Sequence, residues 1–248
     1  MIEFKQVSKV YGTKQALRDV SFTIQPGEIF GLIGHNGAGK STAIKSLVSI
    51  INPTRGEIWV DGEELDQNRL EIKKKIGYVP DSPDMFLRLS ATEYWNLMAS
   101  AYELSTEEMT QRLTYLMDLF DMKENQHGII SSFSHGMRQK TFIIGAILSN
   151  PDIWILDEPM TGLDPQAAFD LKEMMKEHAA KGKIVLFSTH ALEVAQQICN
   201  HIAILKKGEI LYDGTIEDLQ AENENQSLES IYLKMAGREA QSATGGVE

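Results

Sequence analysis

One segment near the start of the chain combines the residue types and the spacing that bind phosphate groups. Residues 34–41 read GHNGAGKS and match the pattern G-x-x-x-x-G-K-[ST], whose glycines let successive backbone N–H groups point at phosphate oxygens. In this pattern the Lys40 ammonium group reaches the terminal phosphates, and the Ser41 hydroxyl group is a ligand of Mg²⁺. The segment therefore predicts a nucleotide site with these binding residues: Asn36, Gly37, Ala38, Gly39, Lys40, Ser41 and Thr42.

The flanking sequence places this loop between a strand and a helix. Residues 28–33 (EIFGLI) are typical of a buried strand, whereas Ile44, Leu47, Val48 and Ile51 recur at the spacing of one helix face. A helix N-terminus favours anions, because its free N–H groups and its dipole carry partial positive charge. The local pattern and its context thus predict the same phosphate site.

A second group with chemical potential ends the apolar segment at residues 153–158 (IWILDE). Asp157 is placed to hold Mg²⁺ through water, and Glu158 is placed to polarise the water that attacks the terminal phosphate. Carboxylates also end many strands as solvated residues without chemistry, and this alternative is the better one for the segment taken alone. Combined with the phosphate loop, the pair favours nucleotide hydrolysis.

Three further motifs follow the order and spacing of a known family. Residues 133–137 (FSHGM) precede a predicted helix, residues 161–164 (TGLD) follow the carboxylate pair, and His190 ends a predicted strand. Together with the phosphate loop and the carboxylates, they resemble the ATP-binding cassette (ABC) ATPases, over residues 1–235. The resemblance implies ATP and Mg²⁺ as cofactors. It also implies a second cassette, in a homodimer or a heterodimer, paired head to tail so that each ATP lies between two chains.

The resemblance also implies roles for residues outside the phosphate loop. Tyr11 would stack on adenine, and His190 would hydrogen-bond the terminal phosphate of ATP. Ser134 and Gly136 would contact the ATP that the other chain holds, and Asp164 would face that opposite site as well. Simpler alternatives stay open: a surface tyrosine, a structural histidine, and plain helix N-caps for the serine and the aspartate.

The chain departs from the family pattern at three positions. His135 and Met137 stand where the family has glycine and glutamine, and Asp81 replaces a glutamine that contacts Mg²⁺ and the attacking water. An ionised aspartate can bind Mg²⁺ but cannot donate a hydrogen bond. We therefore favour Asp81 as a variant ligand, with metal contact through water as the alternative. Residues 78–83 and 133–140 resemble the Ecs-type and ABC-2 exporter branch of the family.

Composition limits the partners and the location of the chain. Its 248 residues are 42% hydrophobic, enough for one domain with subdomains, and its net charge of −11 makes free nucleic acid a poor partner. The one cysteine, Cys199, permits no internal disulfide and fits a reducing compartment. No N-terminal signal pattern is visible, and the longest apolar run, residues 142–148, is too short to cross a membrane. These features fit a cytoplasmic protein, and the ABC resemblance implies that it is bound peripherally to the inner face of the cell membrane.

The order of predicted elements gives the fold class. Strands dominate residues 1–33 and 56–80, helical periodicity with capping boxes at Ser90 and Ser105 follows, and residues 151–205 alternate between strand and helix. This order predicts an α/β fold of the P-loop NTPase type, in which the resemblance implies a RecA-like core with a mostly parallel sheet, an antiparallel β subdomain and an inserted α-helical subdomain. The predicted boundaries are 1–236 for a single ABC ATPase domain, 1–81 and 151–220 for the core plus β subdomain, 82–150 for the helical subdomain, 221–236 for a C-terminal helix and 237–248 for a disordered tail.

These features predict the ATP-hydrolysing subunit of an ABC transporter of the exporter kind. An integral membrane permease would dock near residues 78–100. Two alternatives remain: a soluble ABC ATPase that does not serve transport, and a nucleotide-gated regulatory subunit that binds ATP but barely hydrolyses it. The predicted catalytic residues are Lys40, Asp81, Glu158 and His190, and the predicted metal ligands are Ser41, Asp81 and Asp157.

Overall fold

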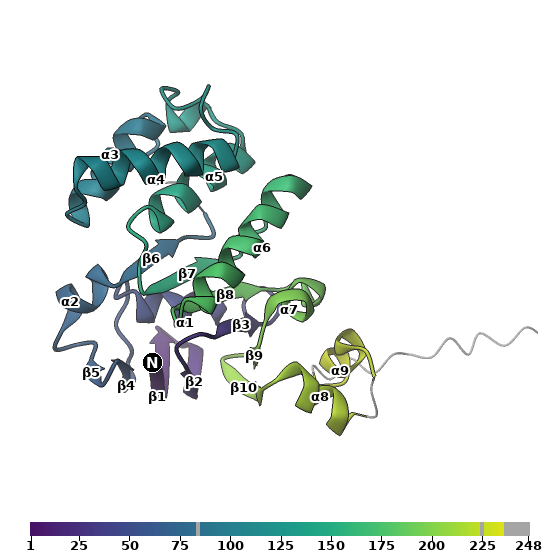
Figure 1. The fold of residues 1–248 in the computed structure, drawn as a ribbon. Coiled ribbons are helices and arrows are strands. Elements are labelled where there is room, and N and C mark those ends of the chain that lie inside the picture. Colours follow the sequence, from purple (N-terminus) through teal and green to yellow (C-terminus); the bar gives the residue numbers. More distant parts are fainter. Residues whose placement is uncertain (83–84, 224–225, 236–248) are drawn as a thin grey trace, which may run out of the picture.

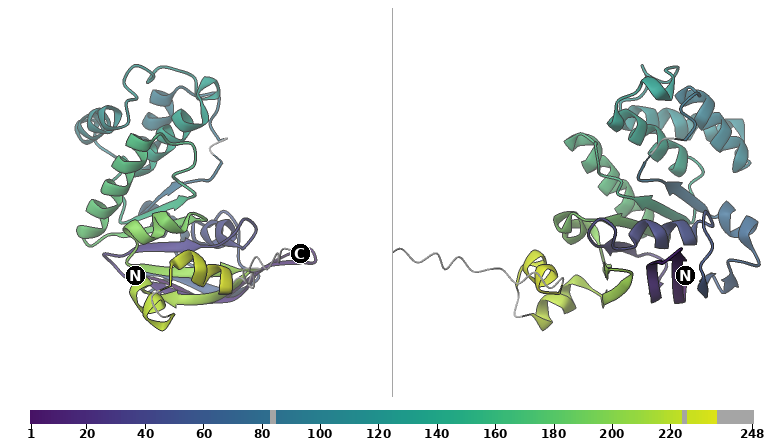
Figure 2. Two further views of the ribbon diagram at one scale, coloured as in Figure 1. Left: turned by 90° about the vertical axis from the view of Figure 1, so that its right-hand side faces the viewer. Right: turned by 180° about the vertical axis from the view of Figure 1, so that it is seen from behind.

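The strands of the protein form two sheets (Figure 1) in a computed structural model that describes residues 1–82, 85–223 and 226–235. The sheets lie together at one end of the molecule, and a group of helices extends away from them at the other, as the turned views also show (Figure 2). This arrangement confirms the predicted α/β fold with a mostly parallel sheet, an antiparallel sheet and inserted helices. The predicted tail of residues 237–248 lies outside the described residues.

The larger sheet has the strand order β10-β9-β3-β8-β7-β6 within the described chain. All neighbours are parallel except β9 and β10. Strands β3, β7 and β8 are buried along their whole length, as parallel strands covered on both faces require, and this explains their continuous apolar runs. The strands are β3 (Ile29–Ile33), β6 (Ile76–Val79), β7 (Ile153–Asp157), β8 (Ile184–Thr189), β9 (His201–Lys206) and β10 (Glu209–Gly214).

The smaller sheet is antiparallel and has the order β2-β1-β4-β5. Asp61 and Gly62 form the tight turn between β4 and β5, and both have positive φ, as is typical of two-residue hairpin turns. Stacked rings of Phe4, Phe22 and Phe30, with centroids 4.3 Å and 5.2 Å apart, join this sheet to the larger one. The strands are β1 (Ile2–Tyr11), β2 (Lys14–Ile24), β4 (Arg55–Val60) and β5 (Glu63–Glu64).

The helices that extend from the sheets occupy the middle of the sequence. Both predicted capping boxes are confirmed, because the hydroxyl groups of Ser90 and Ser105 and the carboxylates three residues later exchange hydrogen bonds with the backbone. Trp95 is fully buried in this group and donates to the carbonyl oxygen of Thr141 across it. The elements are α3 (Ala91–Ala101), α4 (Thr106–Leu119), η1 (Ile130–Ser132) and α5 (His135–Ile147). They fall within the predicted range 82–150, and the boundaries of the subdomains stay a prediction.

The remaining helices pack against the sheets. Among them, α1 follows β3 after the loop of residues 34–39, and α6 runs from the sheet toward the α3–α5 group (Figures 1 and 2). In the part of the chain that the structure describes, no helix is both long and apolar enough to cross a membrane. The bounds are α1 (Lys40–Leu47), α2 (Arg69–Lys74), α6 (Pro165–Ala180) and α7 (Leu192–Ile198).

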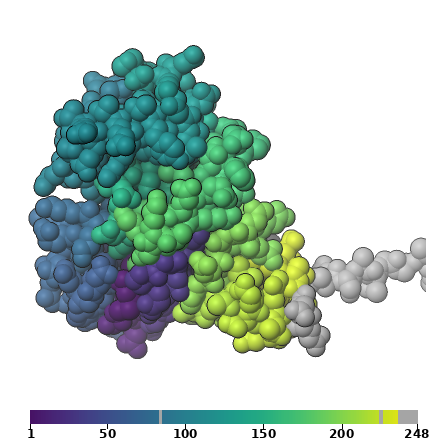
Figure 3. Space-filling model, in the orientation of Figure 1, coloured from purple at the N-terminus to yellow at the C-terminus, as the bar shows by residue number. Residues whose placement is uncertain are grey.

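The C-terminal helix differs from its prediction. Instead of one helix over residues 221–236, the structure has α8 (Ile216–Glu222) and α9 (Leu228–Met235), and residue 236 lies outside the described residues. Helix α8 ends where the Asn223 amide group donates to a carbonyl oxygen of its last turn. The polar run after residue 221 offers no apolar side chain to pack, so the helix does not continue. Figure 3 shows both helices, in yellow, at the surface beside the green segment that follows β8.

The close packing of α3 against α5 gives a first testable prediction. A Cβ atom at Gly145 would lie 2.4 Å from the Tyr94 ring, so Gly145→Ala should lower the free energy of unfolding by about 1–3 kcal/mol. Helix propensity alone gives the opposite sign, because alanine is favoured over glycine by about 1 kcal/mol. Urea unfolding of the variant measures the change, and Ser100→Ala on the exposed face of α3 is the control. A Gly145→Ala variant as stable as the wild type would contradict the packing.

Candidate functional site

A cavity of about 490 Å³ opens where the parallel strands end. Most of its walls come from the segments after β3, β6, β7 and β8, because parallel strands bring their carboxyl ends to one edge of a sheet, and residues of β1 and β2 complete them. The structure thereby brings together most of the predicted site residues: Tyr11, Asn36, Gly37, Gly39, Lys40, Ser41, Thr42, Asp81, Glu158 and His190. Ala38 instead lines a smaller neighbouring cavity of about 240 Å³.

The glycines of the loop after β3 are required by its backbone. Gly37 and Gly39 have φ values of 81° and 118°, in the region that side chains disfavour. At Gly34, a Cβ atom would lie 2.5 Å from the carbonyl oxygen of Leu205. The loop can therefore take this shape only with glycine at these positions, and α1 begins directly after it with Lys40.

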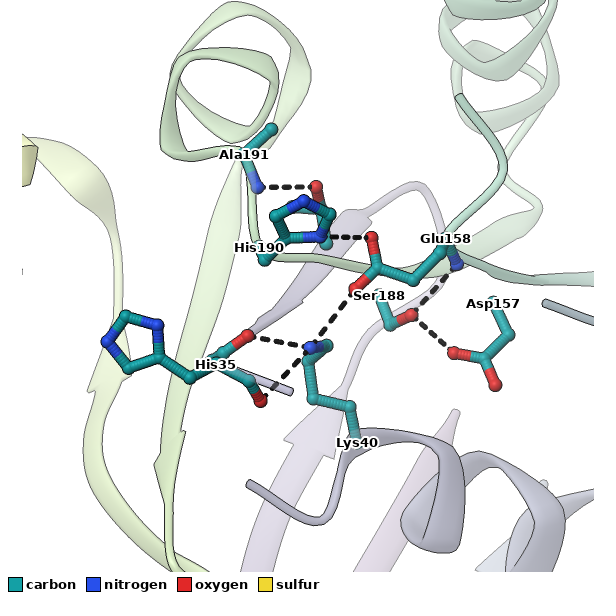
Figure 4. A network of polar contacts seen from close by, with 9 residues as sticks. His35, Lys40, Asp157, Glu158, Ser188, His190 and Ala191 are labelled. Carbon is teal, nitrogen blue, oxygen red and sulfur yellow. Dashed lines mark hydrogen bonds and ion pairs between the residues drawn. The ribbon is translucent and has the colours of Figure 1, made fainter. Parts of the chain in front are cut away.

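Lys40 is buried among oxygen atoms (Figure 4). Its side chain is only 5% exposed, and its Nζ atom donates to the carbonyl oxygens of Gly34 at 2.6 Å and His35 at 3.4 Å. The same Nζ lies 3.0 Å from Glu158 Oε1 in an ion pair. A buried ammonium group requires such partners, because removal from water is costly unless the charge is paired.

Glu158 connects Lys40 to His190. Its second carboxylate oxygen, Oε2, lies 2.9 Å from Nδ1 of His190, so the three side chains form one chain of contacts along the cavity wall (Figure 4). The backbone of Glu158 has a φ of 50°, a left-handed conformation that costs free energy in a residue with a side chain. The turn after β7 thus directs the Glu158 carboxylate into the cavity at a local cost.

Asp157 ends β7 beneath the cavity and is fully buried. Its Oδ1 atom accepts a hydrogen bond of 2.5 Å from the Ser188 hydroxyl group, while its Oδ2 atom is buried and has no hydrogen-bond partner among the described residues. Burial raises the pKa of Asp157, and the hydroxyl groups of Ser188 and Ser41 oppose this rise. The carboxylate of Asp81 lies close enough to raise the same pKa.

These oxygen atoms fit a hard cation. Ser41, Asp81 and Asp157 supply a hydroxyl group and carboxylates, and the free Oδ2 of Asp157 lacks a partner that a cation or its water would provide. Among the described residues, no group of three or more His, Cys, Asp and Glu side chains is arranged to hold a metal ion. Mg²⁺ does not require such a cage, because in nucleotide sites it retains water and binds phosphate oxygens along with one or two carboxylates.

Three predicted residues lie away from this cavity. Ser134 and Asp164 are the N-caps of α5 and α6, and each accepts a hydrogen bond from the first turn of its helix. Asp164 also pairs with Lys140 at 2.7 Å. A Cβ atom at Gly136 would lie 2.4 Å from the carbonyl oxygen of Gly162, so the two helix starts meet closely. Ser134 and Asp164 thus act as helix N-caps, as the simpler alternative for them requires. Their predicted contact with a second chain stays a prediction.

Several cavity residues were not predicted from the sequence. Lys14, His35 and Thr161 line the cavity, and Ser188 joins Asp157 to the backbone of Glu158 beneath it. Ser188 had a detectable signal, because a hydroxyl group in an apolar strand must find a hydrogen-bond partner when buried. Lys14 had none, since its neighbours are an ordinary turn and the polar start of a strand.

Comparison with known proteins agrees with this geometry. A family model described as ABC transporter matches residues 17–161. EcsA of Bacillus subtilis, an ABC-type transporter ATP-binding protein, is 36% identical over 242 residues, which cover 97% of this chain and 98% of EcsA. Nod factor export ATP-binding protein I of Cupriavidus metallidurans is 30% identical over 219 residues, which cover 88% of this chain and 72% of that protein.

A solved structure adds the same likeness in three dimensions. The dimeric ATP-binding cassette MJ0796, in a post-hydrolysis state bound to ADP and Pi, superimposes with a TM-score of 0.79 at 26% identity. The match covers 87% of this chain and 99% of that one. The loop that can bind phosphate and the carboxylates at the strand ends agree with what these relatives indicate. The chain belongs to the ATP-binding proteins of ABC transporters and is an ATPase.

Proposed function

We propose that this chain hydrolyses Mg-ATP between two head-to-tail cassettes and thereby powers export through a separate membrane permease. The observation that carries the proposal is the contact chain of Lys40, Glu158 and His190, which lines one cavity above the buried Asp157. Charge of both signs is concentrated there, as positioning and electrostatic stabilisation of a phosphoryl group require. The chain is assigned to the cytoplasmic side of the membrane, bound peripherally.

The geometry supports separate tasks for the two ends of this contact chain. Lys40 would exchange the Glu158 carboxylate for phosphate oxygens when ATP enters, which frees Glu158 to take a proton from the attacking water. His190, already beside Glu158, would hydrogen-bond the terminal phosphate, and Tyr11 at the rim would stack on the base. Mg²⁺, held by Ser41, Asp157 and Asp81, would neutralise charge on the phosphates.

A second cassette explains the residues that do not reach the cavity of their own chain. Ser134 and Gly136 lie at the N-terminus of the 13-residue helix α5, where backbone N–H groups favour anionic oxygen. Asp164 lies beside them through its pair with Lys140. The likeness to a dimeric cassette bound to ADP and Pi supports pairing, either with an identical chain or with a different cassette.

Apolar side chains near β6 support a docking site for the permease. A cavity of about 200 Å³ is lined by Ile50, Lys73, Tyr78 and Tyr102 together with neighbouring apolar residues, and Ile50 is 56% exposed. Met85, Phe86 and Leu97, which fall within the predicted docking range 78–100, are exposed as well. Residues 83 and 84 of this range lie outside the described residues. The name of the Nod factor export relative and the exporter-like segments 78–83 and 133–140 support export as the direction.

Glu158→Gln tests the catalytic assignment. The amide keeps the shape of the side chain but cannot accept a proton, so steady-state phosphate release should fall at least about 100-fold while ATP binding is retained. Glu107→Gln, an exposed glutamate on α4, is the matched control. Turnover at the wild-type rate in Glu158→Gln would contradict the assignment of Glu158 as the base. Equal turnover in the wild type and Lys40→Ala would favour the regulatory alternative.

Ile50→Asp tests the docking assignment. A carboxylate in an apolar interface is costly to desolvate, so the permease recovered with the tagged chain from detergent-solubilised membranes should fall about tenfold. Leu211→Asp introduces the same charge at an exposed apolar residue on β10, at the opposite edge of the sheet, and should leave recovery unchanged. Quantitative mass spectrometry measures the recovery. Equal loss in both variants would remove the docking site from this face, and a wild type without any membrane partner would favour the soluble alternative.

A further inference from the structure

We propose that Ser188 is a positioning residue of the ATPase site, which orients the Asp157 carboxylate toward Mg²⁺ and fixes it to the backbone of Glu158. The inference rests on the proposed function, because it assumes that Asp157 holds Mg²⁺ and that Glu158 is the base. Ser188 itself does not line the nucleotide cavity. Its effect therefore passes through the two carboxylate residues.

The position of Ser188 follows from strand register. Strands β7 and β8 are parallel neighbours, and Asp157 and Ser188 are direct partners at the end of the paired region. The Ser188 side chain is fully buried, so its hydroxyl group has only protein partners for hydrogen bonds. It donates to Asp157 Oδ1 at 2.5 Å and accepts from the Glu158 backbone N–H at 3.0 Å (Figure 4). A hydroxyl group has one proton, so the Ser188 proton points at Asp157 Oδ1 while its oxygen atom faces the Glu158 N–H group.

The first bond determines which oxygen atom of Asp157 remains available. Oδ1 is engaged by Ser188, and Oδ2 is left without a hydrogen-bond partner among the described side chains and backbone groups. Without the Ser188 hydroxyl group, the carboxylate could rotate about its last bond and present either oxygen. Partners of this kind, one step behind a metal ligand, typically change metal affinity by about 10–100-fold when they are removed.

The second bond holds the turn that carries Glu158. Glu158 has a φ of 50°, and a non-glycine residue keeps such a conformation only where surrounding contacts compensate for its cost. The Ser188 hydroxyl group accepts from the backbone N–H of this residue. One buried oxygen atom thus sets the relative placement of the Asp157 carboxylate and the Glu158 side chain, which reaches Lys40 and His190.

The chain contains the same chemistry at a place without a predicted site. In the antiparallel sheet, the Ser8 hydroxyl group donates to Asp19 Oδ1 and accepts from the Asp19 backbone N–H, both at 2.8 Å. Asp19 also has a positive φ of 44°, and Ser8 is buried. A serine in this arrangement can therefore serve the fold alone. Ser8 supplies a matched control that separates loss of stability from loss of positioning.

The experiment compares Ser188→Ala with Ser8→Ala by a binding measurement that needs no turnover. The affinity of each purified full chain for a non-hydrolysable ATP analogue is measured with EDTA and across a Mg²⁺ titration, and thermal unfolding is recorded in parallel. In Ser188→Ala we expect the gain in affinity due to Mg²⁺ to fall about tenfold, and the Mg²⁺ concentration at half effect to rise by a similar factor. Affinity in EDTA should stay within about twofold of the wild type. Ser8→Ala should unfold at a lower temperature but keep the full Mg²⁺ effect.

A second pair of variants isolates the hydroxyl group from side-chain volume. Ser188→Thr keeps the hydroxyl group, and Ser188→Val replaces it with a methyl group of nearly the same size, so any overpacking is common to both. The threonine variant should retain most of the Mg²⁺ effect, and the valine variant should lose it. This comparison applies even if the alanine variant is too unstable to purify.

The two possible failures are distinguishable. A wild-type chain that does not bind ATP, or that gains nothing from Mg²⁺, would contradict the proposed function and this inference with it. A normal Mg²⁺ effect in the wild type that is equally normal in folded Ser188→Ala and Ser188→Val would overturn the inference alone. Ser188 would then serve only the fold, as Ser8 does.

Discussion

Parallel pairing of β6, β7, β8 and β3 is the constraint on which the rest of the site depends. Strands that run in the same direction must all end at one edge, and the segments that leave them are therefore neighbours in space although they are distant in sequence. The phosphate loop, Asp81, the Asp157–Glu158 pair and His190 each follow one of these strands. Loss of register in one strand would displace its residue from all the others.

The cavity formed at this edge places a buried cation among carboxylates. Lys40 and Glu158 compensate each other's charge, while Asp157 remains below them with one oxygen atom free of protein partners. Burial disfavours the ionised form of Asp157, which the raised pKa of this group reflects. The carboxylate of Asp157 is therefore incompletely compensated by the protein alone, and a cation beside it would favour its ionised form.

Much of this arrangement could be predicted from the sequence because it depends on local patterns. Glycines that a loop requires, continuous apolar runs that end in carboxylates, and serines followed by glutamates at helix starts are all detectable within a few residues. For Ser188, the sequence indicates only that a buried hydroxyl group needs a partner. Which residue that partner is depends on register with β7, which a single sequence does not reveal. The C-terminal helix was predicted from residue 221, whereas α9 begins at Leu228, where apolar side chains resume after polar residues 222–227. The contacts of Ser134 and Asp164 likewise depend on how α5 and α6 meet in space.

The meeting of α5 and α6 has a mechanical consequence. Gly136 lies against Gly162 with no room for a side chain, Lys140 pairs with Asp164, and the Gln139 amide group donates to the carbonyl oxygen of Pro159. The first turns of α5 are thus packed against, and bonded to, the segment that begins immediately after Glu158. If the α3–α5 group swings relative to the sheets, this segment must travel with it or its contacts must break. The fold therefore couples the α3–α5 group mechanically to Glu158, and this coupling depends on a close approach that a single side chain at Gly136 would prevent.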